Sequence, residues 1–160
     1  MSEFTHLDEK GNVRMVDISE KEATLREATA EGIVTMQPDT LALIKNNRIK
    51  KGNVLETARI AGIMAAKKTS DLIPMCHPIA ITHARIDFSF DTASSSIGIR
   101  GTVRVTGQTG VEMEALTAVS TTALTIYDMC KSYDREMIIS DIRLTKKSGG
   151  KSGTFVGRKE

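Results

Sequence analysis

The chain contains the stretch Gly110-Val-Glu-Met-Glu-Ala-Leu116, which opens the segment that decides the fold. The segment runs on to Lys131, and its apolar residues recur with a period of about 3.6 residues, as on one buried helix face. Ionisable residues are absent from Ala115 to Tyr127, so the middle of the segment suits burial. The sequence therefore predicts one long helix, around which the rest of the chain is organised.

Ionisable residues lie at both ends of this predicted helix: Glu112 and Glu114 at the start, Asp128 and Lys131 at the finish. At about 100° per residue, Glu114 and Asp128 point within about 40° of each other, and Lys131 lies one turn beyond. One interpretation is structural, because the terminal charges suit the helix dipole and Asp128 with Lys131 forms an ordinary surface pair. The other interpretation is a functional site on the charged side of an apolar helix.

Composition limits the class of protein. The chain has 160 residues, of which 26% are charged, and a net charge of +2, which predicts one domain and gives no indication of nucleic-acid binding. Aromatic residues make up 4% and Trp is absent, so stacking platforms for nucleic acid are not expected. No apolar run approaches the roughly 18 residues of a membrane span, and two Cys in apolar contexts favour a reducing compartment. We therefore expect a cytoplasmic protein that does not act at a membrane.

The N-terminal half combines a tail, an ambiguous segment and two helices. Residues 1–17 are polar and lack periodicity, which predicts a mobile tail. Residues 18–36 allow two interpretations, because Ser19 and the acids after it resemble a helix start whereas the later β-branched residues favour a strand. Capping residues then predict helices over 37–47 and 53–68.

Alternating apolar and polar residues predict three further strands, at 83–90, 97–106 and 137–145. With a strand at 18–36 the order becomes β-α-α-β-β-α-β, which is the α+β, ferredoxin-like split β-α-β order with an extra helix. A helix at 18–36 would leave too small a sheet to cover its helices. We therefore predict an antiparallel sheet covered by helices, with one domain over 18–146 and a flexible Gly- and Lys-rich tail over 147–160.

The stretch Lys147-Ser-Gly-Gly-Lys-Ser-Gly153 is similar to a P-loop, but its spacing is wrong. The position that requires the first Gly of the motif is Thr145, and too few residues follow for the required helix. A flexible cationic loop that closes over phosphate and a solvated tail both remain open.

The adjacent Cys76 and His77 invite comparison with a metal site, for which Cys130, His83 or His6 could supply further ligands. Zinc sites usually pair their ligands at short spacings, and nothing in the chain has that pattern. A buried Cys76 with a hydrogen-bonded His77 is the simpler interpretation, and His77 as a proton shuttle is the functional one.

Many lysines bracket the Pro-rich segment and the ends of the long helix: Lys50, Lys51, Lys67, Lys68, Lys131, Lys146, Lys147 and Lys151. Most surface lysines are solvated and do nothing specific. Lysines that converge on a site edge, however, neutralise phosphate oxygens.

Five motifs follow one another along nearly the full chain: Met15–Asp17, Thr57–Gly62, Asp71–Pro78, Gly110–Lys131 and Lys147–Gly153. Together they resemble the molybdenum cofactor biosynthesis protein C family, and residues 79–106 are the least family-like part. The resemblance implies a cyclic pyranopterin monophosphate synthase activity, in which 3',8-cyclo-7,8-dihydro-GTP is rearranged and pyrophosphate is released. It also implies a ferredoxin-like subunit in a hexamer built as a trimer of dimers, with sites at subunit interfaces.

The matching motif positions carry the family's functional residues onto this chain. Asp128 carries over as the catalytic carboxylate, and Lys51 and Lys131 carry over as catalytic lysines. The substrate contacts that carry over are Met75, Cys76, His77, Met113 and Glu114, with Glu112 and Lys147 in matched motifs beside them. The resemblance implies no resident cofactor or metal, although magnesium can accompany the triphosphate. It places the protein after a radical enzyme that cyclises GTP.

Two rival functions come from other classes. One is a pterin- or nucleotide-binding oligomer that does not turn over its ligand. The other is a zinc-dependent GTP cyclohydrolase, which would hold metal and release formate. Release of pyrophosphate from cyclised dihydro-GTP separates both from the expected lyase.

Overall fold

An antiparallel sheet with helices packed on one face forms the fold. The computed structural model describes residues 10–157. In chain order the elements are β1 (Thr24–Thr35), α1 (Pro38–Lys45), α2 (Val54–Ala66), α3 (Thr69–Leu72), β2 (His83–Asp91), β3 (Ser96–Gly107), α4 (Glu112–Cys130), β4 (Ile138–Ser148) and β5 (Phe155–Val156). None of the described helices has the length and apolarity that crossing a membrane requires.

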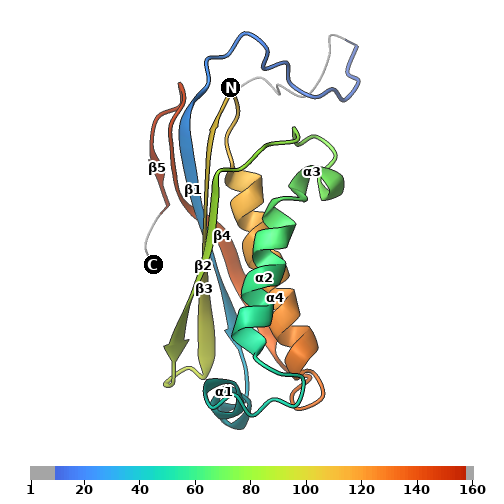
Figure 1. The fold of residues 1–160 in the computed structure, drawn as a ribbon, viewed down its shortest axis with the longest axis vertical. Coiled ribbons are helices and arrows are strands. Elements are labelled where there is room, and N and C mark those ends of the chain that lie inside the picture. The colour runs from blue at the N-terminus through green and yellow to red at the C-terminus, as the bar shows by residue number, and fades with distance from the viewer. Residues whose placement is uncertain (1–9, 158–160) are drawn as a thin grey trace.

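The strand order confirms the predicted α+β, ferredoxin-like architecture. The sheet runs β2-β3-β1-β4-β5, and its neighbouring strands pair antiparallel. The first and last strands of the split β-α-β unit, β1 and β4, therefore lie side by side at its centre. Figure 1 shows α2 and α4 together on one face of this sheet, with α1 at one end of it.

The ambiguous segment is a strand, as the topology required. β1 pairs with β3 along its whole length, from Thr24 opposite Gly107 to Thr35 opposite Ser96. Ala28, Ala30 and Val34 of β1 are buried, which is the alternation expected of a strand with one covered face. The helix-like signal around Ser19 produces no helix, and residues 18–23 instead form a loop and turn ahead of β1, which begins at Thr24.

The helices begin where the sequence predicts. Pro38 lies in the first turn of α1, and the Asn53 side chain caps α2 by accepting a hydrogen bond from the Glu56 amide at 3.1 Å. A Cβ on Gly62 would lie 2.1 Å from the Thr122 hydroxyl oxygen. The absence of a side chain at Gly62 therefore lets α2 pack directly on α4, the buried helix of the core.

The C-terminal segment contains more structure than expected. β4 runs three residues past the predicted 137–145 and ends at Ser148, and β5 then pairs with it through Lys146 and Lys147. The loop predicted after residue 145 is therefore partly sheet, because β1 offers partners as far as Glu27. The short helix α3 was not predicted either. The predicted domain bounds and the mobility of the two tails stay predictions.

Candidate active site

Three of the predicted site residues meet at the C-terminal end of α4. The Lys131 ammonium lies 2.7 Å from one oxygen of the Asp128 carboxylate, and the Lys51 ammonium lies 3.7 Å from the other. Lys51 also donates a hydrogen bond to the Asp128 carbonyl oxygen at 2.8 Å. Lys51 reaches this point from the turn between α1 and α2, so residues 77 positions apart in the sequence form one cluster.

The two lysines set the charge state of this cluster. The hydrogen bond and charge of Lys131, together with the charge of Lys51, lower the pKa of Asp128. The same hydrogen bond and the Asp128 charge raise the pKa of Lys131. At neutral pH the cluster therefore presents a carboxylate between ammonium groups. The Asp128 side chain is 61% exposed, so a substrate can reach it.

A supporting contact holds the Lys51 turn against the end of α4. The Lys50 amide donates a hydrogen bond to the Tyr133 hydroxyl at 3.2 Å, and the Tyr133 amide is bonded in turn to the Cys130 carbonyl. Gly52 has φ +104°, a conformation that Gly adopts without strain. Sequence reasoning identified Lys51 but not Tyr133, because no short-range pattern links the two.

A second group of predicted residues meets at the N-terminal end of α4. A cavity of ≈ 400 Å³ is lined by Met75, Cys76, His77, Glu112, Met113 and Glu114, among others. The His77 ring nitrogen Nε2 lies 2.8 Å from the Val16 carbonyl oxygen, so the N-terminal segment borders the same cavity. The structure therefore brings together all the predicted substrate contacts except Lys147, which lies beside them.

Glu114 is the buried acid of this cavity. It is 3% exposed, and burial together with the nearby charge of Glu112 raises its pKa. Burial and the charge of Glu114 in turn raise the pKa of the Cys76 thiol. A buried carboxyl of raised pKa holds its proton more readily and can donate it to a bound molecule.

Replacing Glu114 with Gln is expected to stabilise the fold at neutral and alkaline pH. Because the folded-state pKa of Glu114 is raised, the folded protein binds this proton more tightly than the unfolded chain does. Its contribution to stability is complete below the unfolded-state pKa and is lost as the pH rises through the folded-state pKa. Melting temperatures measured across pH should therefore diverge as the pH rises, with Glu114→Gln melting higher. Curves that stay parallel from acid to neutral pH would contradict this.

A larger cavity, of ≈ 830 Å³, adjoins the first and shares Glu112 with it. The Lys147 ammonium lies 3.0 Å from the Glu112 carboxylate, and Arg26 and Lys151 also line this cavity. The Arg26 guanidinium is fixed by hydrogen bonds to the carbonyl oxygens of residues 107 and 108. Several cations around a cavity of this size suit an anionic ligand such as a phosphate chain.

Sequence reasoning missed Arg26 and Lys21 at this cavity. Arg26 lies in the segment whose secondary structure was ambiguous, so its position could not be assigned from the sequence. The Gly149-Gly150 turn, with φ +97° and +70°, packs on the backbone and side chain of Arg26. The sheet pairing of β1 with β4, rather than a motif, thus brings Arg26 to the predicted Lys147 loop.

The Asp128 cluster and the Glu114 cavity are two separate places on α4. The helical spacing had instead predicted that these charges share one side of the helix. Glu114 and Asp128 are 14 residues apart on α4, which is about 21 Å along the helix axis at 1.5 Å per residue. Moreover, Glu114 is buried whereas Asp128 is exposed. Only some of the lysines that were predicted to converge on a site edge do so. Lys68, for example, pairs with Asp71 at 3.8 Å instead.

The two cysteines lie at opposite ends of α4, so they do not share a site. Cys76 lines the N-terminal cavity, whereas Cys130 is fully buried in the last turn of α4. His83 opens β2, and His6 lies outside the described residues. Within residues 10–157, no group of three or more His, Cys, Asp or Glu could hold a metal ion.

Cys130→Ala is expected to keep the activity of the protein and to lower its stability by about 1 to 2 kcal/mol. Burial and the nearby charge of Asp134 raise the pKa of Cys130 to about 11, so the group is an unreactive thiol that fills the core. Turnover and thermal unfolding of the variant check both parts. Stoichiometric zinc in the purified parent, lost with activity in the variant, would show a metal role instead.

The fold and these two clusters define an α+β protein with acid–base groups and a cation-lined cavity for a small anionic molecule. The MoaC family model matches residues 15–150 of the chain. Two similar proteins, both named cyclic pyranopterin monophosphate synthase, come from Desulfatibacillum aliphaticivorans and Parvibaculum lavamentivorans. The first is 64% identical and covers 98% of each chain; the second is 62% identical and covers 95% of each chain.

A third similar protein of the same name, from Desulforapulum autotrophicum, is 62% identical over 98% of this chain and 96% of its own. Because the family model spans most of the sequence and the relatives match over nearly their full length, the chain belongs to the MoaC family. The family resemblance inferred from the sequence motifs is confirmed.

Proposed function

We propose that the chain is a cyclic pyranopterin monophosphate synthase of molybdenum cofactor biosynthesis. It takes cyclised dihydro-GTP, rearranges its rings into a pyranopterin, closes a cyclic phosphate and releases pyrophosphate. The observation that carries this proposal is the full-length match to proteins of that name. The Asp128–Lys51–Lys131 cluster supports it, because it offers the acid–base groups that the chemistry needs.

The ring rearrangement requires repeated proton transfers, and the site has groups in both protonation states. Asp128 is a carboxylate and Lys131 is an ammonium. Their ion pair lowers the pKa of the first and raises that of the second, so we propose that substrate takes the place of the partner before Asp128 accepts a proton or Lys131 donates one. Glu114, with its raised pKa, is a further proton donor at the other cluster. His77, which lines the same cavity as Glu114, is the proposed shuttle.

Closure of the cyclic phosphate needs positive charge more than covalent help. A substrate hydroxyl attacks the α-phosphorus, the bond from that phosphorus to the bridging oxygen breaks, and the hydroxyl proton goes to a base. Negative charge grows on the departing pyrophosphate, where fixed cations stabilise it. Lys147, Lys151 and Arg26 around the larger cavity are the cations that we assign to the phosphates.

We infer that one catalytic site combines the two clusters from different subunits. Within one chain the clusters lie at opposite ends of a 19-residue helix. A two-fold axis that sets α4 antiparallel to α4 of a second subunit brings the end of each helix that carries Asp128 toward the end of the other that carries Glu114. We therefore propose a homo-oligomer, specifically a hexamer built as a trimer of dimers.

The cellular setting follows from the same reaction. We propose that the protein acts in the cytoplasm, directly after the radical enzyme that cyclises GTP and whose product it consumes. We expect no resident cofactor, because neither proton transfer nor pyrophosphate release needs one, and magnesium can accompany the triphosphate.

One incubation tests the proposed function against its rivals. Purified protein is mixed with cyclised dihydro-GTP, and pyrophosphate, formate and bound zinc are measured. Catalytic release of pyrophosphate without formate supports the proposal. Stoichiometric binding without product would indicate a binding module, and formate release with bound zinc would indicate a cyclohydrolase.

A further inference from the structure

An acid of the protein itself occupies the cavity whose cations suit a phosphate chain. Glu112 opens α4, and its carboxylate lies 3.0 Å from the Lys147 ammonium. Both side chains are less than a third exposed, at 29% and 28%. The Lys147 ammonium also donates a hydrogen bond to the Ser152 hydroxyl at 3.1 Å. One of the cations that we assign to the phosphates is therefore already paired with an anion.

Glu112 lies where the two cavities at this end of α4 meet. The walls of both cavities include Thr109, Gly110 and Glu112. The smaller cavity contains the buried Glu114, and the larger one contains Lys147 and the other cations. A ligand that extends from the smaller cavity into the larger one therefore passes the Glu112 carboxylate.

Gly110 leaves the room in which this carboxylate lies. A Cβ added to Gly110 would lie 2.6 Å from the carboxyl carbon of Glu112 and 2.8 Å from its Oε1 atom, and it would meet the Oε2 atom as well. The three heavy atoms nearest to such a Cβ thus all belong to Glu112. The φ angle of Gly110 is not positive, unlike those of Gly149 and Gly150, so the backbone conformation does not require a glycine here. The absence of a side chain at Gly110 instead provides space for the Glu112 carboxylate.

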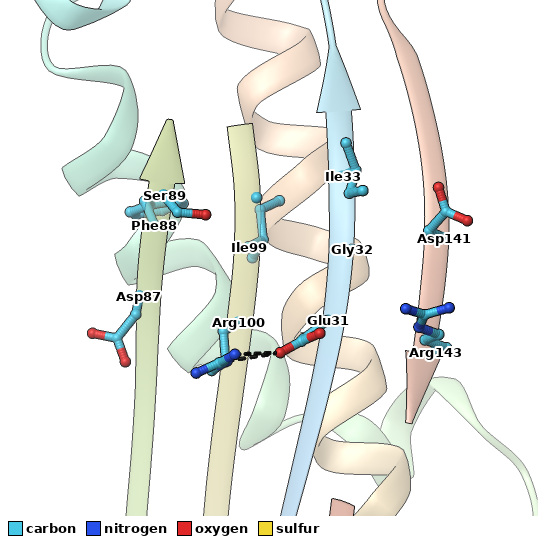
Figure 2. A pocket seen from close by; sticks show the side chains of 11 residues that line it. Glu31, Gly32, Ile33, Asp87, Phe88, Ser89, Ile99, Arg100, Asp141 and Arg143 are labelled. Atoms are coloured by element: carbon cyan, nitrogen blue, oxygen red, sulfur yellow. Dashed lines mark hydrogen bonds and ion pairs between the residues drawn. The ribbon is translucent and has the colours of Figure 1, made fainter. Parts of the chain in front are cut away.

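An ion pair within the sheet provides a contrast. Figure 2 shows Glu31 of β1 and Arg100 of β3 extending toward each other from neighbouring strands, and their charged groups are 2.7 Å apart. The two residues lie opposite each other in the strand register, so strand pairing alone brings them together. No strand register joins Glu112 of α4 to Lys147 of β4. Their contact depends instead on the space that Gly110 leaves.

We infer that Glu112 competes with phosphate for Lys147, and that a bound phosphate chain displaces the Glu112 carboxylate. Two anions at hydrogen-bond distance from one ammonium repel each other, so one of them leaves. A phosphate chain has several charged oxygens and can contact Arg26 and Lys151 at the same time, which a single carboxylate cannot do. The competition lowers the affinity of the cavity for pyrophosphate, which must leave after each turnover. The identity of this anion rests on the proposed function.

The competing explanation of the ion pair is structural. A carboxylate in the first turn suits the helix dipole, and its contact with Lys147 fastens β4 to the start of α4. The two explanations predict opposite effects on anion binding. If the pair only organises the cavity, breaking it loosens Lys147 and weakens the binding of a phosphate chain. If Glu112 competes with the ligand, breaking the pair strengthens that binding.

Gly110→Ala tests this difference without removing a charge. The added Cβ forces the Glu112 carboxylate out of its place, and the fold should persist because only the end of a flexible side chain has to move. Calorimetric titration of the full-length protein with inorganic pyrophosphate, without substrate, measures Kd. We expect Gly110→Ala and Glu112→Gln each to lower this Kd about three- to tenfold, the equivalent of one ion pair. Together they should lower it no further than the stronger one alone, since both act through the same contact.

Two matched controls should keep the parent Kd. Gly107→Ala adds a Cβ that makes only ordinary contact with the Val105 side chain, at 3.4 Å, and Glu56→Gln removes an equal charge from α2. Unchanged or weaker pyrophosphate binding by Gly110→Ala and Glu112→Gln would overturn the inference, as would the absence of binding in parent and variants alike. Should thermal unfolding show that Gly110→Ala does not fold, Glu112→Gln decides alone. Turnover of cyclised dihydro-GTP is assayed separately, so failure of the proposed function would be recognised independently of these binding results.

Discussion

Replacing Asp128, Lys51 or Lys131 with Ala is expected to lower the rate of pyrophosphate release about a hundredfold to ten-thousandfold, as the loss of a general acid or base does. The three side chains share one cluster, with the Asp128 carboxylate 2.7 Å and 3.7 Å from the two ammonium groups. All three variants should remain folded, because an exposed pair one helical turn apart contributes only about 0.2–0.5 kcal/mol. Turnover and circular dichroism on the same samples measure both effects.

Lys151→Ala provides the contrast for these variants. Lys151 lines the cation-rich cavity and not the Asp128 cluster, so its loss should raise KM for cyclised dihydro-GTP more than it lowers kcat. The Ala variants of Asp128, Lys51 and Lys131 could instead turn over near the parent rate. In that case Asp128 and Lys131 would form only an ordinary surface ion pair, as the helical spacing also allows.

Local sequence patterns were sufficient to predict those helices and strands in which one face is buried, because burial of one face requires a regular spacing of apolar residues. The apolar period of α4 and the Asn53 cap of α2 gave their helices nearly to the residue. β1 could be assigned from propensity only in the second half of residues 18–36, because Ser19 and the acids after it, which precede the strand, favour a helix. The segment was nevertheless assigned as a strand, because only a strand at this position completes the order of strands in the sheet. That order is a property of the whole chain and not of a local pattern.

The missed elements depend on partners that are distant in the sequence. β4 continues to Ser148 because Glu27 and Thr29 of β1 offer it a ladder, and β5 forms on the new edge. The four-residue helix α3 fits between the end of α2 and Pro74, too short for any periodic signal. Interactions of this kind are decided by pairing and packing and have no local signature.

The candidate site shows a similar division. Helical geometry correctly placed Lys131 beside Asp128, and the family resemblance implied Lys51. A helical wheel, however, ignores distance along the helix axis. The wheel therefore placed Glu114 with Asp128. In the structure, the loop containing Cys76 covers the Glu114 end of α4, whereas the Asp128 end is exposed. Arg26 was missed because its place depends on β1 lying beside β4. This axial separation is also what leads us to a site made by two subunits.

Mixing two inactive variants is expected to restore activity if the site is shared between subunits. Asp128→Ala disables the cluster at one end of α4, and Glu114→Gln disables the cluster at the other. In a mixed pair of subunits, one site receives both substitutions and the other receives neither. Random pairing of equal amounts makes half of the dimers mixed, so about a quarter of the parent rate should return. Pyrophosphate release after re-annealing measures it.

A second mixture, of Asp128→Ala with Lys131→Ala, is the control for this experiment. Both substitutions fall in the same cluster, 2.7 Å apart in the parent, so every site in a mixed oligomer still contains one of them. This mixture should stay at the background rate of the single variants. If each chain instead held a complete site of its own, the Asp128→Ala and Glu114→Gln mixture would be just as inactive, since every chain would keep its own lesion. Recovery in the first mixture alone therefore requires that Asp128 of one subunit and Glu114 of another serve the same substrate.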